Sequence, residues 1–231
     1  MPEILLGIDT STPAASVAVS RPGVMLGEIL VNVRIPHSDR LLCLVEQLLS
    51  DCGLSVREVD ALALAVGPGS FTGLRVGMAT VKGLALATGK PVAAISSLRM
   101  LAMQAPCAHY PVCSLFDARK QQVYAGLFHW QNGLPQAMRP EVVVAPRDLL
   151  ATLVEPTIFV GDGAQVYREL IVERLAGRAH FLPFSHQQPR AAHLLPLAAE
   201  DLRQGRRTSL AELAPHYIRR SEVEIMFGPA E

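Results

Sequence analysis

Residues 67–89, GPGSFTGLRVGMATVKGLALATG, are the stretch that decides the fold expected for this chain. Pro68 stands between two glycines, which predicts a tight bend, and Ser70 or Thr72 can cap the free N–H groups of a following helix. Residues 61–66 before the bend and 91–96 after the helix are continuous apolar runs, typical of buried strands. Strand, helix and strand together predict a parallel crossover.

A row of small residues runs along the predicted helix. Gly73 and Gly77 lie four residues apart, and Thr80, Gly83 and Ala87 continue the spacing. Because glycine in a helix interior costs about 1 kcal/mol relative to alanine, the row implies close approach of another backbone or of a ligand. The row faces either a helix of another protein or the chain's own sheet, and the sequence supports both interpretations.

Composition narrows the classes of function. The chain carries no net charge, which argues against a broad positive face that binds nucleic acid unaided. Half of the residues are apolar and only 18% are charged. This composition fits either a surface hidden against another protein or a compact core alone. Glu3 stands where a signal peptide would be basic, and charged residues interrupt every long apolar run. We therefore expect a cytoplasmic protein without a membrane segment.

A shift in composition near Pro106 divides the chain into two halves, and the sequence shows no internal repeat. The first half predicts three antiparallel strands at residues 4–8, 15–20 and 24–33, and then a helix that starts at His37. The crossover described above follows, and a helix over residues 97–105 closes this half. In the second half, apolar runs and turn residues predict strands near residues 112–117, 122–130 and 157–160, a hairpin turn at Asn132-Gly133, and helices over residues 146–154, from about 165, and over 190–204.

Several polar groups are candidates for chemistry. Asp9-Thr10-Ser11 follows the first strand and suits either a phosphate-binding loop or an ordinary polar turn, and we favour the turn. Asp117 and Arg119 suit a structural ion pair better than a catalytic pair. Residues 161–163, GDG, follow a strand but lack the further glycine and the lysine of a nucleotide fingerprint. His37 has no second metal ligand within a helical turn, so we interpret it as a cap or surface histidine.

Five segments carry a resemblance to a known family. ILLGIDTST, HSDRLL, VGPGSFTGLRVGMATVKGLALA, FDARKQQVYAG and PHYIRR, taken together, resemble the bacterial TsaB family, also called YeaZ. The resemblance implies an α/β, actin-like (ASKHA, ribonuclease-H-like) fold of two lobes, each with a mixed sheet flanked by helices. Residues 1–105 would form the first lobe and 106–205 a degenerate second lobe, with the segment 206–231 packing back on the first.

The resemblance also implies a function and partners. The family takes part in making threonylcarbamoyladenosine on tRNA, as a scaffold and activating subunit for a catalytic paralogue, TsaD, together with the ATPase TsaE. We expect no cofactor to be bound by this chain alone. The resemblance leaves open whether ATP or ADP binds at the junction with TsaD. We expect contact with tRNA only through the complex. We also expect a homodimer when TsaD is absent.

The catalytic paralogue carries a metal-binding motif, HMEGH, after the strand that follows the glycine-rich helix. On this chain the motif falls on residues 97–101, so that Ser97 and Leu101 occupy the positions of the two histidines and Arg99 the position of the acid. Leucine cannot bind a metal, and arginine disfavours one. We therefore expect no metal site and no catalytic residue. An actin-like kinase or ATPase is the alternative function, and a glycoprotease-type metalloprotease is a weaker one.

If the scaffold interpretation holds, the contact surface is expected on two helices, the one after His37 and the glycine-rich one. The residues predicted for this surface are His37, Leu41, Leu44, Leu48, Phe71, Gly73, Arg75, Val76, Gly77, Thr80 and Gly83.

Overall fold

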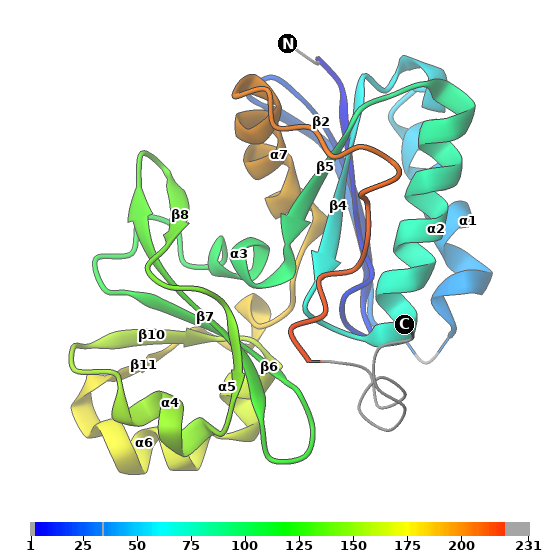
Figure 1. Ribbon diagram of the computed structural model, residues 1–231. Coiled ribbons are helices and arrows are strands. Elements are labelled where there is room, and N and C mark those ends of the chain that lie inside the picture. Colours follow the sequence, from blue (N-terminus) through cyan, green and yellow to red (C-terminus); the bar gives the residue numbers. More distant parts are fainter. Residues whose placement is uncertain (1–2, 34, 220–231) are drawn as a thin grey trace.

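Two lobes, each built on one mixed β-sheet, make up the computed structural model, which describes residues 3–33 and 35–219 (Figure 1). The sheet of lobe 1 has the strand order β3 (Val24–Val31), β2 (Ala15–Arg21), β1 (Leu5–Asp9), β4 (Ala61–Gly67) and β5 (Val92–Ser96). The first three strands pair antiparallel, whereas β1 with β4 and β4 with β5 pair parallel. Both the opening antiparallel strands and the parallel crossover are confirmed.

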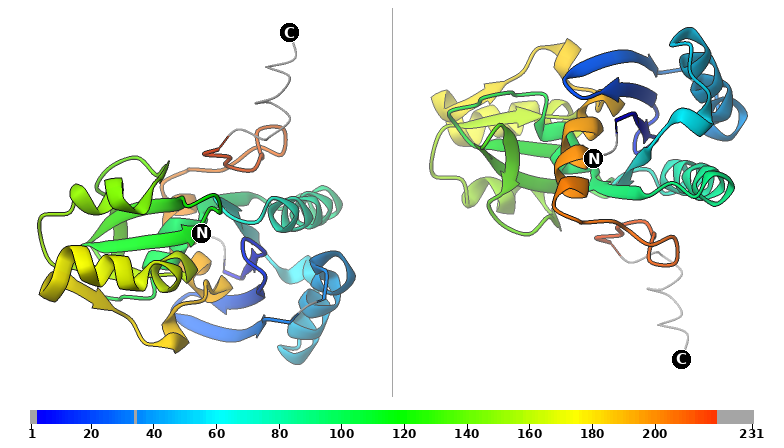
Figure 2. Two further views of the ribbon diagram at one scale, coloured as in Figure 1. Left: turned by 90° about the horizontal axis from the view of Figure 1, so that it is seen from below. Right: turned by 90° about the horizontal axis from the view of Figure 1, so that it is seen from above.

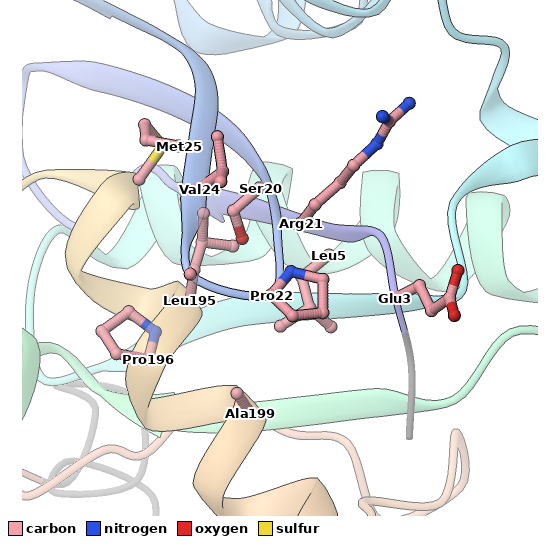
Figure 3. A pocket seen from close by; sticks show the side chains of 11 residues that line it. Glu3, Leu5, Ser20, Arg21, Pro22, Val24, Met25, Leu195, Pro196 and Ala199 are labelled. Carbon is pink, nitrogen blue, oxygen red and sulfur yellow. The ribbon is translucent and has the colours of Figure 1, made fainter.

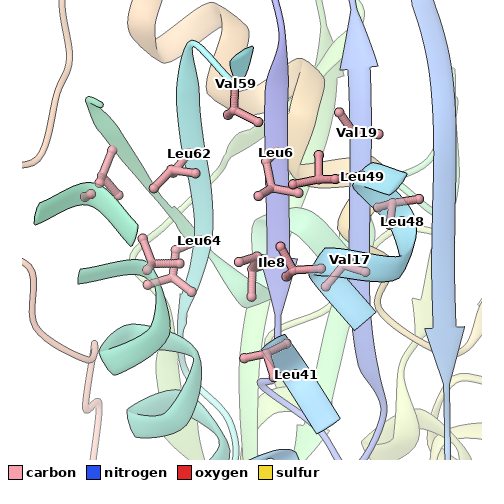
Figure 4. Close-up of a cluster of buried hydrophobic side chains, with 14 of the residues drawn as sticks. Leu6, Ile8, Val17, Val19, Leu41, Leu48, Leu49, Val59, Leu62 and Leu64 are labelled. Carbon is pink, nitrogen blue, oxygen red and sulfur yellow. The ribbon is translucent and has the colours of Figure 1, made fainter. Parts of the chain in front are cut away.

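Helices cover both faces of this sheet. The helices α1 (His37–Asp51) and α2 (Phe71–Thr88) lie side by side on one face, on the side of lobe 1 away from lobe 2, and α7 (Leu194–Arg203) covers the other (Figures 1 and 2). Side chains alternate along β1, so Leu6 and Ile8 pack under α1 and α2 (Figure 4) while Leu5 packs against α7. The predicted adjacency of the two helices is confirmed.

Lobe 2 repeats the sheet order of lobe 1. Its path is β11 (Ala179–Phe181), β10 (Thr157–Val160), β6 (Val112–Asp117), β7 (Val123–Gln131) and β8 (Leu134–Ala137), with β9 (Val142–Val144) also paired to β7. As with β1, the strand β6 has antiparallel partners on one side and parallel ones on the other. One face packs on α4 (Pro146–Ala151), α5 (Asp162–Val166) and α6 (Arg168–Leu175), and the opposite face packs on α3 (Ser97–Ala102). The repeated order gives the actin-like class that was expected.

Some predicted boundaries were wrong. The helix α3 ends at Ala102 rather than near residue 105, and the helix expected over 190–204 begins only at Leu194, after a single 3₁₀ turn over Ala191–His193. The helix expected from about residue 165 begins at Asp162, whose carboxylate accepts the N–H of Gly163 at 2.8 Å. Acidic residues stabilise a helix start in this way, so Asp162 and Gly163 form the first turn of the helix and Gly161 is its N-cap.

Residues 206–219 lie along the edge of the lobe 1 sheet (Figure 1). The N–H of Thr208 donates to Val92 O over 2.9 Å, and that of His216 donates to Val66 O over 2.7 Å. At its end the segment reaches lobe 2, where Arg219 Nη1 donates to Ala118 O over 2.7 Å. The predicted lobe boundaries stay predictions, except that α7, which falls within the predicted second lobe, packs on the lobe 1 sheet. Residues 220–231 of the segment expected to pack on lobe 1 lie outside the described residues. Within the described part of the chain, no helix has the length and apolar character needed to cross a membrane.

Candidate functional site

The turn that follows β1 is fastened to the first turns of α2. Thr10 Oγ1 donates to the carbonyl oxygen of Gly73 over 2.7 Å, and the N–H of Ser70 donates to the carbonyl oxygen of Ser11 over 2.7 Å. Ser70 is also the N-cap residue of α2, since its Oγ accepts the N–H of Gly73 at 3.2 Å. The first turn of the chain and the glycine-rich motif therefore form one structural unit.

The glycines of the motif make this contact possible. A Cβ atom at Gly73 or Gly77 would lie less than 3.0 Å from the carbonyl oxygen or the Oγ1 of Thr10, and one at Gly69 would meet the carbonyl oxygen of Ser11 as closely. Real Cβ atoms essentially never come so near to another atom. Of the two interpretations of the small-residue row, packing within the chain accounts for Gly73 and Gly77, although their closest contact is with Thr10 of the first turn rather than with the sheet.

The predicted partner surface is smaller than the sequence indicated. Leu41 and Leu48 belong to the core of lobe 1, and Gly73 and Gly77 are buried against the first turn. The prediction for these positions is corrected, because the apolar stripe of an amphipathic helix faces its own sheet. The remaining positions keep some exposure: Phe71, Arg75 and Gly83 are exposed, and His37, Leu44, Val76 and Thr80 are half-buried.

The start of α1 reaches the same turn. His37 Nε2 lies 2.9 Å from the carbonyl oxygen of Thr12, and Arg40 Nη2 donates to the carbonyl oxygen of Pro13 over 3.3 Å. Burial lowers the pKa of His37, although the bond to Thr12 opposes the shift. The histidine thus serves in a structural contact, and the capping residue of the helix is Pro36.

Asp9 is the most perturbed acid of this unit. Its side chain is fully buried, and burial raises its pKa from 3.8 to about 6, against the opposing effect of a 2.9 Å bond from the N–H of Ser11 to Oδ1. Neither Asp9 Oδ2 nor Ser11 Oγ has a hydrogen-bond partner among the described residues. No group of three or more His, Cys, Asp or Glu side chains in that part of the chain could hold a metal ion.

A cleft of about 330 Å³ separates the first turn from lobe 2. It is lined on one side by Ser11 and Phe71 and on the other by acidic groups, Asp117 and Asp162, together with Arg119. Asp117 Oδ2 pairs with Arg119 Nη1 at 3.0 Å, which confirms the predicted ion pair. Burial is the main cause that raises the pKa of Asp162 above its usual range, and the nearby carboxylate of Asp117 adds to the shift. The two carboxylates disfavour an unaccompanied phosphate.

The positions that correspond to the paralogue's metal ligands have structural roles. Ser97 is fully buried, and its Oγ accepts the N–H of Gly67 at 3.0 Å. Leu101 is fully buried in the core next to lobe 2. Arg99 Nε donates to Pro135 O over 3.1 Å, and its Nη1 lies 3.5 Å from the carboxylate of Asp201. Arg99 and Leu101 thus join the two lobes, whereas Ser97 fixes α3 to the end of β4.

Sequence reasoning missed an aromatic cluster at the mouth of the cleft. Tyr217 stacks on Phe71 with ring centroids 5.2 Å apart, and Arg75 both covers the Phe71 ring and donates to Tyr217 Oη over 3.1 Å. The two rings come from segments almost 150 positions apart in the sequence, and local sequence patterns do not predict contacts over such a separation. Both rings are partly exposed, so the cluster borders the proposed partner surface.

A second cavity, of about 300 Å³, lies at the opposite end of the lobe 1 sheet (Figure 3). Its lining is mainly apolar, with Val24 and Met25 from β3 and Leu195 and Pro196 from α7. It lies apart from the buried acid and the cleft, so the candidate site is the unit formed by the first turn, α2 and the cleft.

Two lobes of the same sheet order, closing on a cleft whose floor is the turn after β1, define an actin-like protein of the ASKHA class. A family model described as "TsaD: tRNA N6-adenosine threonylcarbamoyltransferase" matches residues 32–227. Similar over nearly their whole length are the tRNA threonylcarbamoyladenosine biosynthesis proteins TsaB of Bacillus subtilis, 31% identical over 95% of this chain and 96% of that protein, and of Escherichia coli, 30% identical over 93% and 94%. The chain belongs to the TsaB (YeaZ) family.

Solved structures agree with this assignment. YeaZ from Pseudomonas aeruginosa is 33% identical, with a TM-score of 0.79, and the match covers 93% of this chain and 99% of that one. A structure described as having similarity to peptidase YEAZ, also from Pseudomonas aeruginosa, is 34% identical, with a TM-score of 0.82 over 94% of this chain and 100% of that one. The resemblance found in the sequence is confirmed.

Proposed function

We propose that this chain takes part in tRNA threonylcarbamoyladenosine biosynthesis as the supporting partner of TsaD. The observation that carries the proposal is the similarity, over nearly the whole length of both chains, to proteins that bear the name of that pathway. Contacts of the first turn with α1 and α2 position the exposed parts of both helices.

The proposal assigns the chemistry of transfer to TsaD. Support comes from the buried Ser97 and Leu101, which occupy the positions of metal ligands and cannot hold a metal between them. The described residues contain no alternative cluster of ligands. In this account the chain acts through contact and has no catalytic residue, and the same observations speak against a metalloprotease.

The contact surface is assigned to the exposed sides of α1 and α2. Leu42 and Leu86 are 57% and 74% exposed, and Phe71 is 44% exposed, so apolar side chains extend along both helices. An exposed apolar surface of this kind is typical of a protein interface. We assign it to TsaD, with TsaE joining the assembly, and to a second copy of the chain when TsaD is absent.

A bound nucleotide, ATP or ADP, would lie at the junction between this chain and TsaD. Arg75 covers Phe71 and Arg219 donates to Ala118, two residues that line the cleft, and both arginines carry charge suited to phosphates. Asp117 and Asp162 within the cleft disfavour phosphates. We therefore assign ATP or ADP, if bound, to the junction with TsaD and not to this chain alone. The alternative function, an actin-like kinase or ATPase, rests on the unpartnered carboxylate oxygen of Asp9 next to the cleft. ATP turnover by the isolated chain that Asp9→Ala abolishes would favour that alternative.

Sedimentation tests the assembly directly. The chain alone is expected to sediment as a dimer, and addition of TsaD is expected to replace that species by a complex containing both proteins, to which TsaE binds. A chain that stays monomeric at high concentration contradicts the homodimer, and a chain that sediments independently of TsaD contradicts the proposed function.

A further inference from the structure

A polar pocket of about 420 Å³ lies between the lobes, on the side away from α1 and α2. Lobe 1 contributes Arg99 from α3 and the end of α7, and lobe 2 contributes the β7–β8 hairpin. In Figure 1 the hairpin and α7 stand on opposite sides of the gap between the lobes, with α3 below them. None of the groups discussed above as part of the first-turn unit lines this pocket.

The pocket concentrates positive charge in a chain whose net charge is zero. Arg99, Arg203 and Arg206 line it, and Arg207 is exposed next to them. The carboxylates that pair with these arginines are Glu200 and Asp201, so the guanidinium groups outnumber them. The local excess of positive charge therefore attracts an anion.

The carboxylates orient the arginines without using all of their donors. Arg203 donates from Nε and Nη2 to Glu200, at 2.9 and 2.7 Å, and Asp201 pairs with both Arg99 and Arg206. Arg203 Nη1 and Arg99 Nη2 have no hydrogen-bond partner among the described residues. Since each guanidinium carries five N–H donors, groups held in this way are preorganised to bind oxygen atoms of a ligand.

The facing hairpin supplies neutral donors and acceptors. Gln131, Asn132 and Gln136 line the pocket from lobe 2, and Gln204 lines it from the end of α7. The positive φ values of Asn132 (53°) and Gly133 (77°) fix the two-residue turn of the hairpin. The ligand thus meets arginines on one side and amides on the other.

We propose that this pocket binds phosphate groups of an RNA backbone. The inference rests on the proposed function, which supplies tRNA as the RNA. A site of guanidinium and amide groups with little apolar lining matches the polar, positively charged character of nucleic-acid interfaces. An acidic protein segment is the less suitable ligand, because protein interfaces are built around buried apolar or aromatic anchors. Among the residues that the structure describes, Leu134 is the only large apolar side chain that lines the pocket.

The position of the pocket agrees with use inside the complex. The proposed TsaD surface and the pocket lie on opposite sides of the lobe 1 sheet, so docking of TsaD leaves the arginines open to solvent. The weak overall charge means that the chain alone binds RNA poorly, whereas a phosphate contact adds to affinity once TsaD holds the tRNA.

The test measures tRNA affinity of the complex with TsaD at salt concentrations from about 50 to about 200 mM. The double variant Arg203→Gln/Arg206→Gln is expected to weaken binding. It is also expected to reduce the steepness of the negative slope of log K against log salt by about 2, since two phosphate contacts are lost. The matched control is Arg147→Gln/Arg174→Gln, which removes the same charge from exposed positions on α4 and α6 and is expected to leave the slope unchanged.

A second variant separates lost contacts from lost charge. Glu200→Gln/Arg203→Gln keeps the net charge and still removes one guanidinium, so it is expected to lower the slope by about 1. If the complex forms but the slope is unchanged in both pocket variants, the inference is wrong and the proposed function stands. It is also wrong if the pocket variants weaken protein assembly and leave tRNA binding intact. If the wild-type chain does not bind TsaD, the proposed function fails and the inference falls with it.

Discussion

Thr10 and Gly73 are locked together in lobe 1: the Thr10 hydroxyl donates to the carbonyl oxygen of Gly73 over 2.7 Å, and no Cβ atom fits at Gly73 beside the Thr10 backbone. This pair joins the first turn of the chain to the helix that presents the proposed partner surface. The glycine-rich motif therefore has a structural role within lobe 1, where it holds α2 against the first turn.

Gly73→Ala is expected to destabilise the protein by about 1–3 kcal/mol, because the added methyl group forces the turn and α2 apart. Gly83→Ala is the matched control on the same helix. Its Cβ would meet nothing within 4 Å, so this substitution is expected to stabilise the protein by about 0.5–1 kcal/mol. Denaturant unfolding of both variants makes the comparison, and equal effects would contradict the assigned role of Gly73.

Asp9 should give stability a defined dependence on pH. Its pKa is about 6 in the folded protein and 3.8 without burial, so the folded state holds its proton more tightly. The contribution of this group to the free energy of unfolding has its full value below about pH 4, and it falls by about 3 kcal/mol as the pH rises through 6. The free energy of unfolding of Asp9→Asn relative to wild type should therefore rise by that amount between about pH 4 and pH 7. A difference that does not change with pH would show that Asp9 is ionised normally.

Docking of TsaD can be tested at a glycine that the fold does not need. Gly83 is exposed on α2, so Gly83→Arg is expected to leave folding intact and to weaken TsaD binding at least tenfold by holding the surfaces apart. Gly177→Arg is the control, because a Cβ at this lobe 2 position also meets nothing within 4 Å. Titration calorimetry of both variants with TsaD gives the result, and equal affinities would exclude this part of α2 from the interface.

The aromatic pair at the cleft should be energetically coupled. A double-mutant cycle with Phe71→Ala and Tyr217→Ala is expected to show a coupling of about 0.5–1.5 kcal/mol in unfolding free energy, since the rings stack. Additive effects in the cycle would mean that ring stacking does not help to hold residues 206–219 in place.

Local patterns in the sequence were sufficient for much of the fold. The strand that ends at Gly67, the bend and α2 carry strong turn and cap residues, and their order predicted the parallel crossover. The short strands β9 and β11 were missed because each has only three residues, too few to show alternation. The start of α5 at Asp162 was misplaced because turn residues and first-turn residues of a helix are of the same types.

The candidate site was harder to predict, because a helical pattern shows which residues share a face and not what lies opposite. Gly73 and Gly77 were correctly grouped, yet the group they meet, Thr10, lies more than sixty positions away. Leu41 and Leu48 were assigned to a partner surface although their spacing equally fits the buried stripe of an amphipathic helix. The link from Tyr217 to Phe71 depends on the returning C-terminal segment, which no local signal specifies.

The proposed function requires that tRNA modification depends on this chain although the chain does not carry out the chemistry. Its most direct test is to mix the chain with TsaD, TsaE, tRNA and threonylcarbamoyl-adenylate, and to measure threonylcarbamoyladenosine on the tRNA as each protein is omitted in turn. We expect modification to be lost without this chain, and we expect the chain alone to modify no tRNA. Undiminished modification in its absence, or transfer by the chain alone, would show that the chain does not have this role.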